Sequence, residues 1–239
     1  MNQAIDSFLE MALELVYPTR CVVCERPGAV LCEKDIDSLV MIDHRTACPN
    51  CGAPFGRQLC TECMTRVGAE QFAFQEAFSV LQYNKAAEAI VLGYKNGNER
   101  RLASEIAMLM AASLPLEWRL WTDAITWVPA DRKAFQQRGF DHMAMLAEEL
   151  STVLAINAFR TLFKQAKIDQ RALTRLLRRA NVSSLFSISE EVEAVVDRSI
   201  NLLLLDDVFT TGATLDSASL VLAEAGFSSI RALTFARVW

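Results

Sequence analysis

The stretch LLLLDDVFTTGAT, which runs from Leu202 to Thr214, gives the strongest indication of the fold. Its four leucines predict a strand over Ile200–Leu205 that is buried on both faces, as strands of a parallel sheet are. Asp206 and Asp207 are expected where this strand ends, and two adjacent carboxylates are costly there unless they bind something. The loop Thr210–Thr214 then opens a helix, so its N–H groups, its hydroxyls and the helix dipole favour a phosphate.

The paired carboxylates beside this loop indicate a ligand that carries more than a phosphate. Carboxylates repel a phosphate, but they accept hydrogen bonds from sugar hydroxyls and bind hydrated Mg2+. Gly212 is expected to let the backbone approach the anion closely. The stretch therefore predicts a site for a ribose 5-phosphate group. The alternative is an ordinary strand-to-helix turn capped by Thr and Asp side chains.

From about residue 70, predicted strands and helices alternate. Strands are predicted at Gln71–Tyr83, Ala124–Val128 and Ser229–Ala236, and helices at Ala86–Leu92, Arg101–Ser113, His142–Leu154 and Ser217–Ala225. This alternation predicts an α/β fold with a mainly parallel sheet and helices on both faces. Ligands of such sheets bind beyond the carboxyl ends of the strands, where the two aspartates are expected.

All seven cysteines lie between Cys21 and Cys63, which indicates a separate metal-binding module. Two residues between cysteines let both sulfurs point at one ion, and the lack of an export signal favours metal ligands over disulfides. One set is complete, with Cys48, Cys51, Cys60 and Cys63. Four thiolates saturate a tetrahedral zinc ion, so this set predicts a structural zinc site.

The preceding set consists of Cys21, Cys24 and Cys32, with Asp35 where the pattern would place a fourth cysteine. A carboxylate also binds zinc, so a second site with three thiolates and one carboxylate is chemically feasible. His44 is another candidate for the fourth ligand. Two further interpretations stay open, namely a site that has lost its metal and knuckles that pair across the two sets.

These patterns divide the chain into two predicted domains. Residues 1–68 are expected to form an N-terminal helix, marked by apolar residues between Ile5 and Val16, and a small zinc-ribbon-like module. Residues 69–239 are expected to form the α/β domain. The chain has no long apolar segment that could span a membrane and no recognisable secretory signal, so we expect no membrane insertion and a cytoplasmic location.

The net charge of −5 means that any contact with nucleic acid needs a local basic patch. Such a stretch runs from Arg160 to Arg179, with seven cations and one acid. It is interpreted as a hood over the predicted phosphate site, as a nucleic-acid contact, or as a solvated helix face. The candidate residues for the first two roles are Arg171, Arg175, Arg178 and Arg179.

The stretch Leu202–Thr214 closely resembles the motif of type I phosphoribosyltransferases that binds phosphoribosyl pyrophosphate (PRPP). The resemblance implies that Asp206 and Asp207 are catalytic residues that bind the ribose hydroxyls. It implies that the 5-phosphate is held by Thr210, Thr211, Gly212, Ala213 and Thr214. The loop after Val128-Pro129 resembles the loop that receives pyrophosphate, which makes Arg132 and Lys133 candidates to neutralise the leaving group; otherwise they are solvated cations.

A series of blocks in one order resembles the ComF family, which is linked to natural competence and to the use of external DNA. The blocks are the cysteine knuckles, Leu92–Arg101, Val128-Pro129, Arg138–His142, Arg178–Asn181 and the Asp-Asp loop. Within them, Lys95, Arg100, Arg101 and Arg138 are further candidate cations, although each is equally typical of a solvated helix face. The chain departs from the family at Asp141-His142, where Asn-Gln is usual, and at Asp35.

The resemblance implies a type I phosphoribosyltransferase-like fold and binding of PRPP, or a related phosphosugar, with Mg2+. Transfer of a phosphoribosyl group from PRPP is the preferred interpretation, in the uptake or use of external DNA, with no acceptor readable. The alternatives are a non-catalytic accessory that handles single-stranded DNA and docks on a DNA-translocating helicase, and a PRPP-sensing regulator. No Ser/His/Asp relay, HExxH site or Walker loop is recognisable in the sequence.

Overall fold

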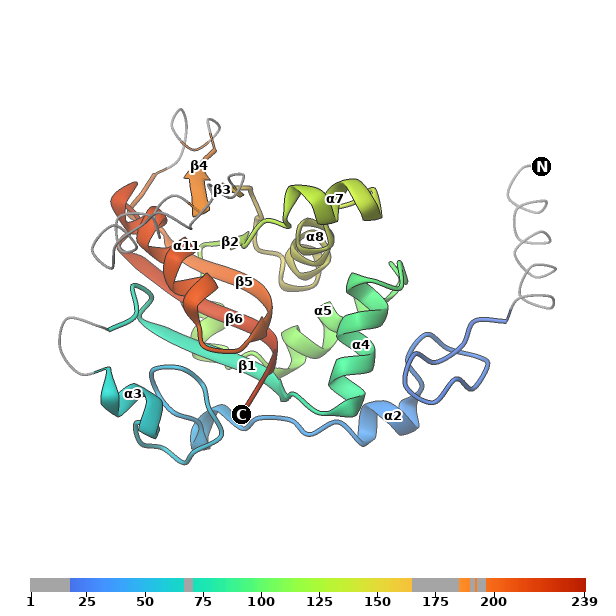
Figure 1. The fold of residues 1–239 in the computed structure, drawn as a ribbon. Coiled ribbons are helices and arrows are strands. Elements are labelled where there is room, and N and C mark those ends of the chain that lie inside the picture. The colour runs from blue at the N-terminus through green and yellow to red at the C-terminus, as the bar shows by residue number, and fades with distance from the viewer. Residues whose placement is uncertain (1–17, 67–70, 165–184, 190–191, 193–196) are drawn as a thin grey trace, which may run out of the picture.

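The computed structural model describes residues 18–66, 71–164, 185–189, 192 and 197–239. A four-stranded sheet forms the centre of the molecule (Figure 1). Its strands are β1 (Glu76–Gln82), β2 (Ala124–Trp127), β5 (Asn201–Phe209) and β6 (Ser229–Arg237). They lie in the order β1-β6-β5-β2, and every neighbouring pair is parallel. The predicted α/β class with a mainly parallel sheet is therefore confirmed.

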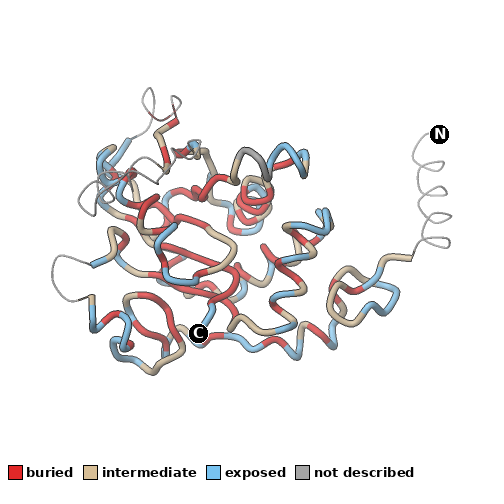
Figure 2. The backbone as a smooth tube through the Cα atoms, viewed as in Figure 1, coloured by how far each residue is buried: buried red, intermediate tan, exposed pale blue. Residues whose placement is uncertain are grey.

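Helices cover both faces of this sheet (Figure 1). On one face lie α4 (Lys85–Lys95), α5 (Leu102–Ser113), α6 (Leu116–Trp121) and α8 (His142–Leu154), and on the other lies α11 (Ala213–Glu224). The helix predicted at His142–Leu154 has the predicted bounds, and the others begin or end a few residues away from them. Figure 2 shows the buried residues concentrated in the strands and on the helix faces that meet them.

The central strand β5 confirms the prediction of a strand buried on both faces. Leu203 and Leu205 pack into the apolar cluster on the α4, α5 and α8 face, whereas Leu202 and Leu204 pack into the cluster on the α11 face. All four side chains are fully buried. This alternation is the two-residue period of a strand between two layers.

β5 differs from the prediction because it continues through both aspartates to Phe209. Its partner β6 is equally long, and the ladder between them pairs Asp206 with Thr234. On the other side β2 ends at Trp127, opposite Leu205. The aspartates therefore have β6 beside them on one side, but β2 has already ended on the other side.

Several elements were not expected from periodicity. Three-residue strands β3 (Leu162–Lys164) and β4 (Phe186–Ile188) form an antiparallel pair, and α7 (Arg132–Arg138) replaces an expected loop. The cysteine region contains the short helices α2 (Glu33–Asp37), η1 (His44–Thr46) and α3 (Thr61–Thr65). The predicted N-terminal helix and most of the basic stretch lie outside the described residues, as does the predicted domain boundary at residue 68.

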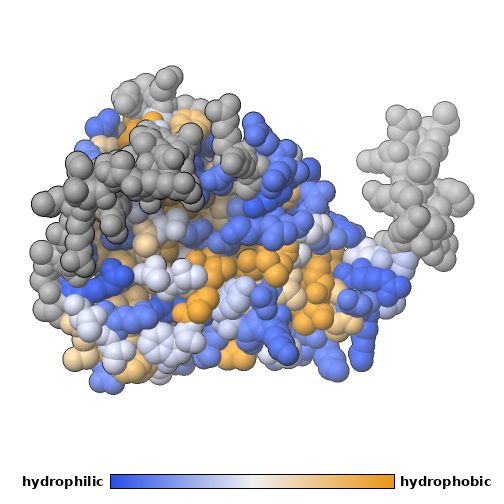
Figure 3. Space-filling model, viewed as in Figure 1, coloured by the Kyte–Doolittle hydropathy of each residue, from blue (hydrophilic) through white to orange (hydrophobic). Residues whose placement is uncertain are grey.

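Polar residues cover most of the face seen in Figure 1, and an apolar band crosses it between α11 and α4 (Figure 3). Within the described ranges, no helix combines the length and the apolar character needed to cross a membrane.

Candidate functional site

A cavity of about 200 Å3 lies at the carboxyl ends of β2 and β5. Its charged lining consists of Lys95, Asp131, Arg138, Lys164, Asp206 and Asp207. Thr214 from the start of α11 lines the same cavity, so the aspartates and one end of the predicted phosphate loop meet at one place. This is the edge at which ligands of parallel sheets bind.

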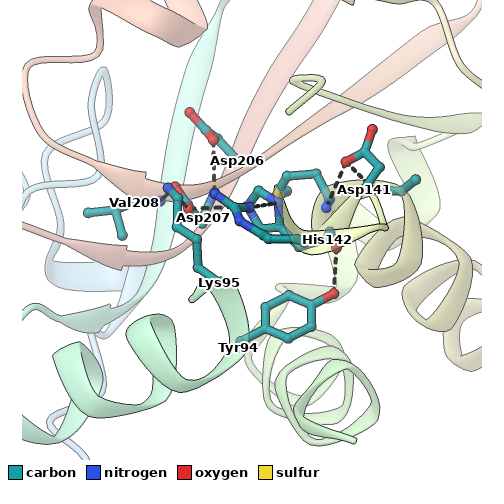
Figure 4. A network of polar contacts seen from close by, with 10 residues as sticks. Tyr94, Lys95, Asp141, His142, Asp206, Asp207 and Val208 are labelled. Atoms are coloured by element: carbon teal, nitrogen blue, oxygen red, sulfur yellow. Dashed lines mark hydrogen bonds and ion pairs between the residues drawn. The ribbon is translucent and has the colours of Figure 1, made fainter. Parts of the chain in front are cut away.

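Asp207 is contacted by a lysine and a histidine side chain from two different helices (Figure 4). Lys95 of α4 forms an ion pair with its Oδ2, and His142 Nε2 lies 3.4 Å from the same oxygen. Burial alone would raise the pKa of Asp207, but the hydrogen bond from His142 and the charge of Lys95 outweigh it and lower that pKa. Asp207 therefore stays ionised.

The partners of His142 indicate which of its ring nitrogens donates and which accepts a hydrogen bond. Arg138 Nη1 donates to His142 Nδ1 at 3.0 Å. A guanidinium group only donates hydrogen bonds, so Nδ1 must be the unprotonated nitrogen and Nε2 carries the hydrogen that points at Asp207. Tyr94 Oη donates to the backbone carbonyl of His142, which further fixes the start of α8.

Asp206 has a different environment from Asp207. Its Oδ1 accepts a hydrogen bond of 2.9 Å from the backbone N–H of Asp207, and Figure 4 shows its side chain turned away from Lys95 and His142. Burial, and then the neighbouring charge of Asp207, raises the pKa of Asp206. One aspartate is therefore ion-paired and charged, while the other binds a proton readily.

The structure assigns separate roles to the residues at which the chain departs from the family pattern. Asp141 caps α8, because its Oδ1 accepts hydrogen bonds from the N–H groups of Met143 and Ala144 at 3.1 and 3.2 Å. Its Oδ2 also accepts from Arg160 Nη2 at 3.2 Å. His142 joins the site through Asp207 and Arg138, contacts that the sequence did not predict.

In the loop Thr210–Thr214, Gly212 is buried and its four neighbours are exposed. Gly212 has φ of +77°, and a Cβ atom there would lie 2.6 Å from the ring of Phe209 and 2.9 Å from that of Phe72. Glycine is thus required by a left-handed backbone and by an aromatic contact, in addition to any approach of an anion. As the N-cap of α11, Gly212 supplies no capping side chain.

Arg132 and Lys133 begin α7, and their side chains lie outside the described part of the structure. The hydrogen bond of 2.8 Å from Phe135 N to Asp131 O shows that helical bonding starts at Asp131. The cations that the structure does bring to the cavity are Lys95, Arg138 and Lys164. Arg171, Arg175, Arg178 and Arg179 lie in the undescribed range 165–184, so their predicted roles stay predictions.

The second zinc centre consists of Cys48, Cys51, Cys60 and Cys63, whose sulfur atoms lie within 4.8 Å of one another. The fully buried Arg237 donates from Nη2 to Cys51 Sγ at 3.4 Å. Its Nε and Nη1 have no hydrogen-bond partner among the described residues. Its Nη2 also forms an ion pair with Glu62 Oε2 of α3 at 3.4 Å. Zinc with four thiolates carries a net negative charge, which complements this buried guanidinium beside Cys51. The residues therefore fit zinc.

The first zinc centre consists of Cys21, Cys24, Cys32 and Asp35, whose ligand atoms also lie within 4.8 Å of one another. Asp35 Oδ2 lies 3.0 Å from Cys21 Sγ and 3.1 Å from Cys32 Sγ. Each set converges on its own, so the ligands do not pair across the two sets.

His44 is not the fourth ligand of the first centre. Its ring packs edge-on against Phe78 and Trp118, with centroids 5.6 and 5.9 Å apart. The fourth position is occupied by Asp35, and a carboxylate with three thiolates is a donor set that zinc accepts.

Comparison with known proteins places a double zinc ribbon domain at residues 12–67. Competence protein F of Haemophilus influenzae is 25% identical over 214 residues, which cover 86% of this chain and 88% of that protein. The DNA utilization protein YhgH of Salmonella typhi is 24% identical over 237 residues, covering 91% and 96%. YhgH of Escherichia coli K12 is 24% identical over 230 residues, with the same coverage. The ribbon match and the two ligand clusters support zinc as the bound metal.

Proposed function

Because the chain belongs to the ComF family, we propose that it binds PRPP, or another ribose 5-phosphate compound, with Mg2+ at the cavity beside Asp206 and Asp207. Its relatives are named for competence and for DNA utilization, and we infer a role in the same process. One observation carries the proposal: the paired aspartates, the last residue of the threonine loop and three cations line a single cavity.

The loop Thr210–Thr214 suits the 5-phosphate of such a ligand. The hydroxyl-bearing side chains of Thr210, Thr211 and Thr214 are exposed, and the loop leads into the N-terminus of α11. The twelve residues of this helix add a positive dipole end to the loop N–H groups.

Three cations that line the cavity suit the diphosphate. Lys95, Arg138 and Lys164 come from three separate elements and line the same cavity. Cations placed in advance stabilise the negative charge that develops on a departing diphosphate. Lys95 is oriented by Asp207, and Arg138 is oriented by His142.

The two aspartates would then divide the remaining work. Both oxygens of Asp207 are engaged, Oδ2 by Lys95 and His142 and Oδ1 by the N–H of Val208 at 2.8 Å. Among the described contacts, Asp206 is engaged only through Oδ1. Asp206 is therefore the freer carboxylate for ribose hydroxyls or for Mg2+, and Asp207 mainly positions Lys95.

As an enzyme the protein would transfer the phosphoribosyl group to an acceptor. The bond from ribose C1 to the diphosphate oxygen breaks with its electrons on the diphosphate, and a bond from the acceptor to C1 forms. This chemistry needs orientation and charge stabilisation but no covalent protein nucleophile.

Calorimetric titration of PRPP in the presence of Mg2+ tests the proposal. We expect binding to wild type and a loss of about tenfold or more in Asp206→Asn, since a bidentate or metal contact is removed. Asp197→Asn is the matched control, because Asp197 is an exposed acid just before β5, at the far end of the strand from the cavity. Wild type that shows no heat of binding and no rise in melting temperature at millimolar PRPP would contradict the proposal.

Two other functions are tested by the same material. A PRPP-sensing regulator would bind PRPP but release no pyrophosphate with any base, amine or nucleotide acceptor. A DNA-handling accessory, which the names of the relatives favour, would bind single-stranded oligonucleotides in an anisotropy titration. Arg175→Glu/Arg178→Glu should then weaken that binding, because each phosphate contact contributes salt-dependent affinity.

A further inference from the structure

The second zinc ribbon directly contacts the loop Thr210–Thr214. Arg66 is the C-cap residue of α3, the short helix that carries the zinc ligand Cys63. Its Nη2 donates to the carbonyl oxygen of Thr211 at 3.3 Å. Its guanidinium also lies 4.4 Å from the centre of the Phe72 ring. One side chain of the ribbon therefore contacts both the phosphate loop and a ring that touches it.

That ring belongs to an aromatic platform under the loop, formed by Phe72, Phe74 and Phe209. Phe72 and Phe74 stack with centroids 4.5 Å apart, and Phe209 meets Phe72 edge-on at 6.1 Å. Gly212 rests on the platform so closely that a Cβ atom would overlap two of its rings. A displacement of the platform must therefore displace Gly212 and the loop around it.

The zinc centre reaches the same platform by a second route. The guanidinium of Arg237 lies between Cys51 Sγ, at 3.4 Å from Nη2, and the ring of Phe209, at 4.2 Å from its centre. Arg237 is fully buried, and its Nη2 also pairs with Glu62 Oε2 at 3.4 Å, on the same short helix α3 as the zinc ligand Cys63. Both ribbon contacts of Arg237, Cys51 and Glu62, lie on segments that the metal would tie together, so loss of the metal would loosen the support of the guanidinium against Phe209.

We propose that Arg66 and Arg237 are positioning residues through which zinc at the second centre holds the threonine loop in its phosphate-binding shape. The link to phosphate affinity rests on the function proposed above, but the link to loop order does not. Removing the metal, or the Arg66 contact alone, should loosen the loop and weaken the binding of phosphate esters.

Arg66→Gln is the first test, because Arg66 is only half-buried and its replacement leaves the zinc ligands in place. Arg45→Gln is the matched control, since Arg45 lies on the same module with an 85% exposed side chain and pairs with Asp43. We expect Arg66→Gln to speed amide hydrogen exchange at Thr210–Thr214 and to weaken PRPP binding about three- to tenfold, as loss of one charged hydrogen bond does. Zinc content should stay unchanged, and Arg45→Gln should match wild type.

The measurement separates the two ideas. Wild type that fails to bind PRPP overturns the proposed ligand, while faster loop exchange in Arg66→Gln still supports the coupling. Loop exchange in Arg66→Gln that equals wild type and Arg45→Gln overturns the coupling, even if PRPP binds.

Stepwise removal of zinc with a chelator is the second test, with exchange followed in the ligand-free protein. We expect the amides of Thr210–Thr214 to lose protection together with metal from the second centre, and before those of α8 on the other face of the sheet. Full loss of that metal with unchanged protection of the loop would overturn the proposal.

Discussion

The two zinc centres share a cysteine spacing but differ in what surrounds them. The first centre packs with the α4 and α5 side of the sheet, and two of its ligands, Cys24 and Cys32, are only partly buried. The second packs with the α11 side, and all four of its cysteines are buried. It alone, within the described structure, has a buried arginine against a ligand sulfur.

The difference shows that two motifs with the same cysteine spacing can contribute unequally to the stability of the fold. The segment of the first centre packs against α4, the helix that carries Lys95. Val22 lies so close to Gly93 of this helix that a Cβ atom added at Gly93 would be 3.2 Å from the Val22 side chain. The second centre lies beside the loop predicted to hold phosphate. Loss of the first would loosen one helix contact, whereas loss of the second would loosen the segment whose Cys51 and Glu62 contact the buried Arg237.

The largest expected effect is the loss of one ligand from each centre. Cys51→Ser should destabilise the fold by about 3–5 kcal/mol, the typical result when one partner of a buried, charged contact is removed; here the contact joins a zinc thiolate to the buried Arg237. Cys24→Ser should cost clearly less, because Cys24 is half-exposed and no buried cation depends on it. Urea unfolding with zinc analysis provides the measurement, and equal losses in the two variants would contradict the contrast.

A pair of glycines provides the next test. A Cβ at Gly52, which follows Cys51, would lie 2.6 Å from the backbone oxygen of Ala77, whereas a Cβ at Gly28 would meet nothing described within 4 Å. Both have positive φ, so alanine strains each backbone by roughly 1–3 kcal/mol. Gly52→Ala should exceed Gly28→Ala in lost unfolding free energy, because β1 must also move, and the reverse order would refute this account.

Asp35→Cys should make the first centre resemble the second. A thiolate replaces a carboxylate in a set that already has three thiolates, and zinc–thiolate bonding is stronger at neutral pH. We expect retention against a chelator to improve by about ten- to a hundredfold, the usual range for changes around a metal site. Asp37→Asn, an exposed acid nearby on the same helix, serves as the control. An unchanged release curve for Asp35→Cys would show that the carboxylate is not a ligand.

The smallest effect concerns the two aspartates of the cavity. Asp207 is ion-paired with Lys95, whereas the structure gives Asp206 no ion pair among the described residues. Because the folded-state pKa of Asp206 is raised, its contribution to stability is present below the ordinary Asp pKa and is lost as pH rises through the raised value. Asp206→Asn should therefore gain stability relative to wild type as pH rises across that window. Thermal unfolding at several pH values measures this, and a difference independent of pH would contradict the assignment.

Sequence reasoning succeeded where the signal was local. Four consecutive leucines in a short apolar run are typical of a strand between two layers, and ligand spacing in the cysteine sets reflects a single turn of chain around an ion. It failed where neighbours decide the outcome. β5 continues through the polar residues Asp206 and Asp207 because β6 pairs with this part of the strand. The two residues themselves give no sign of this pairing in the sequence.

The parts of the site that the sequence left open depend on long-range contacts. Arg237 lies 186 positions from Cys51, and nothing in its own surroundings marks it as buried. Arg138 ends α7 and His142 begins α8, so no helical spacing relates them, and the contact of His142 with Asp207 spans 65 positions. β3 and β4 are three residues each, too short to show a period.

The order of the strands also has a consequence for synthesis of the protein on the ribosome. β1 pairs only with β6 among the described strands, so Ser79 meets its hydrogen-bond partner Thr234 after 155 further residues have been added. Because translation adds about 5–20 residues per second, roughly ten seconds or more pass between synthesis of the ribbon cysteines and completion of the sheet. We expect zinc to be acquired during this interval, when the nascent thiols are still open to oxidants and to competing metals.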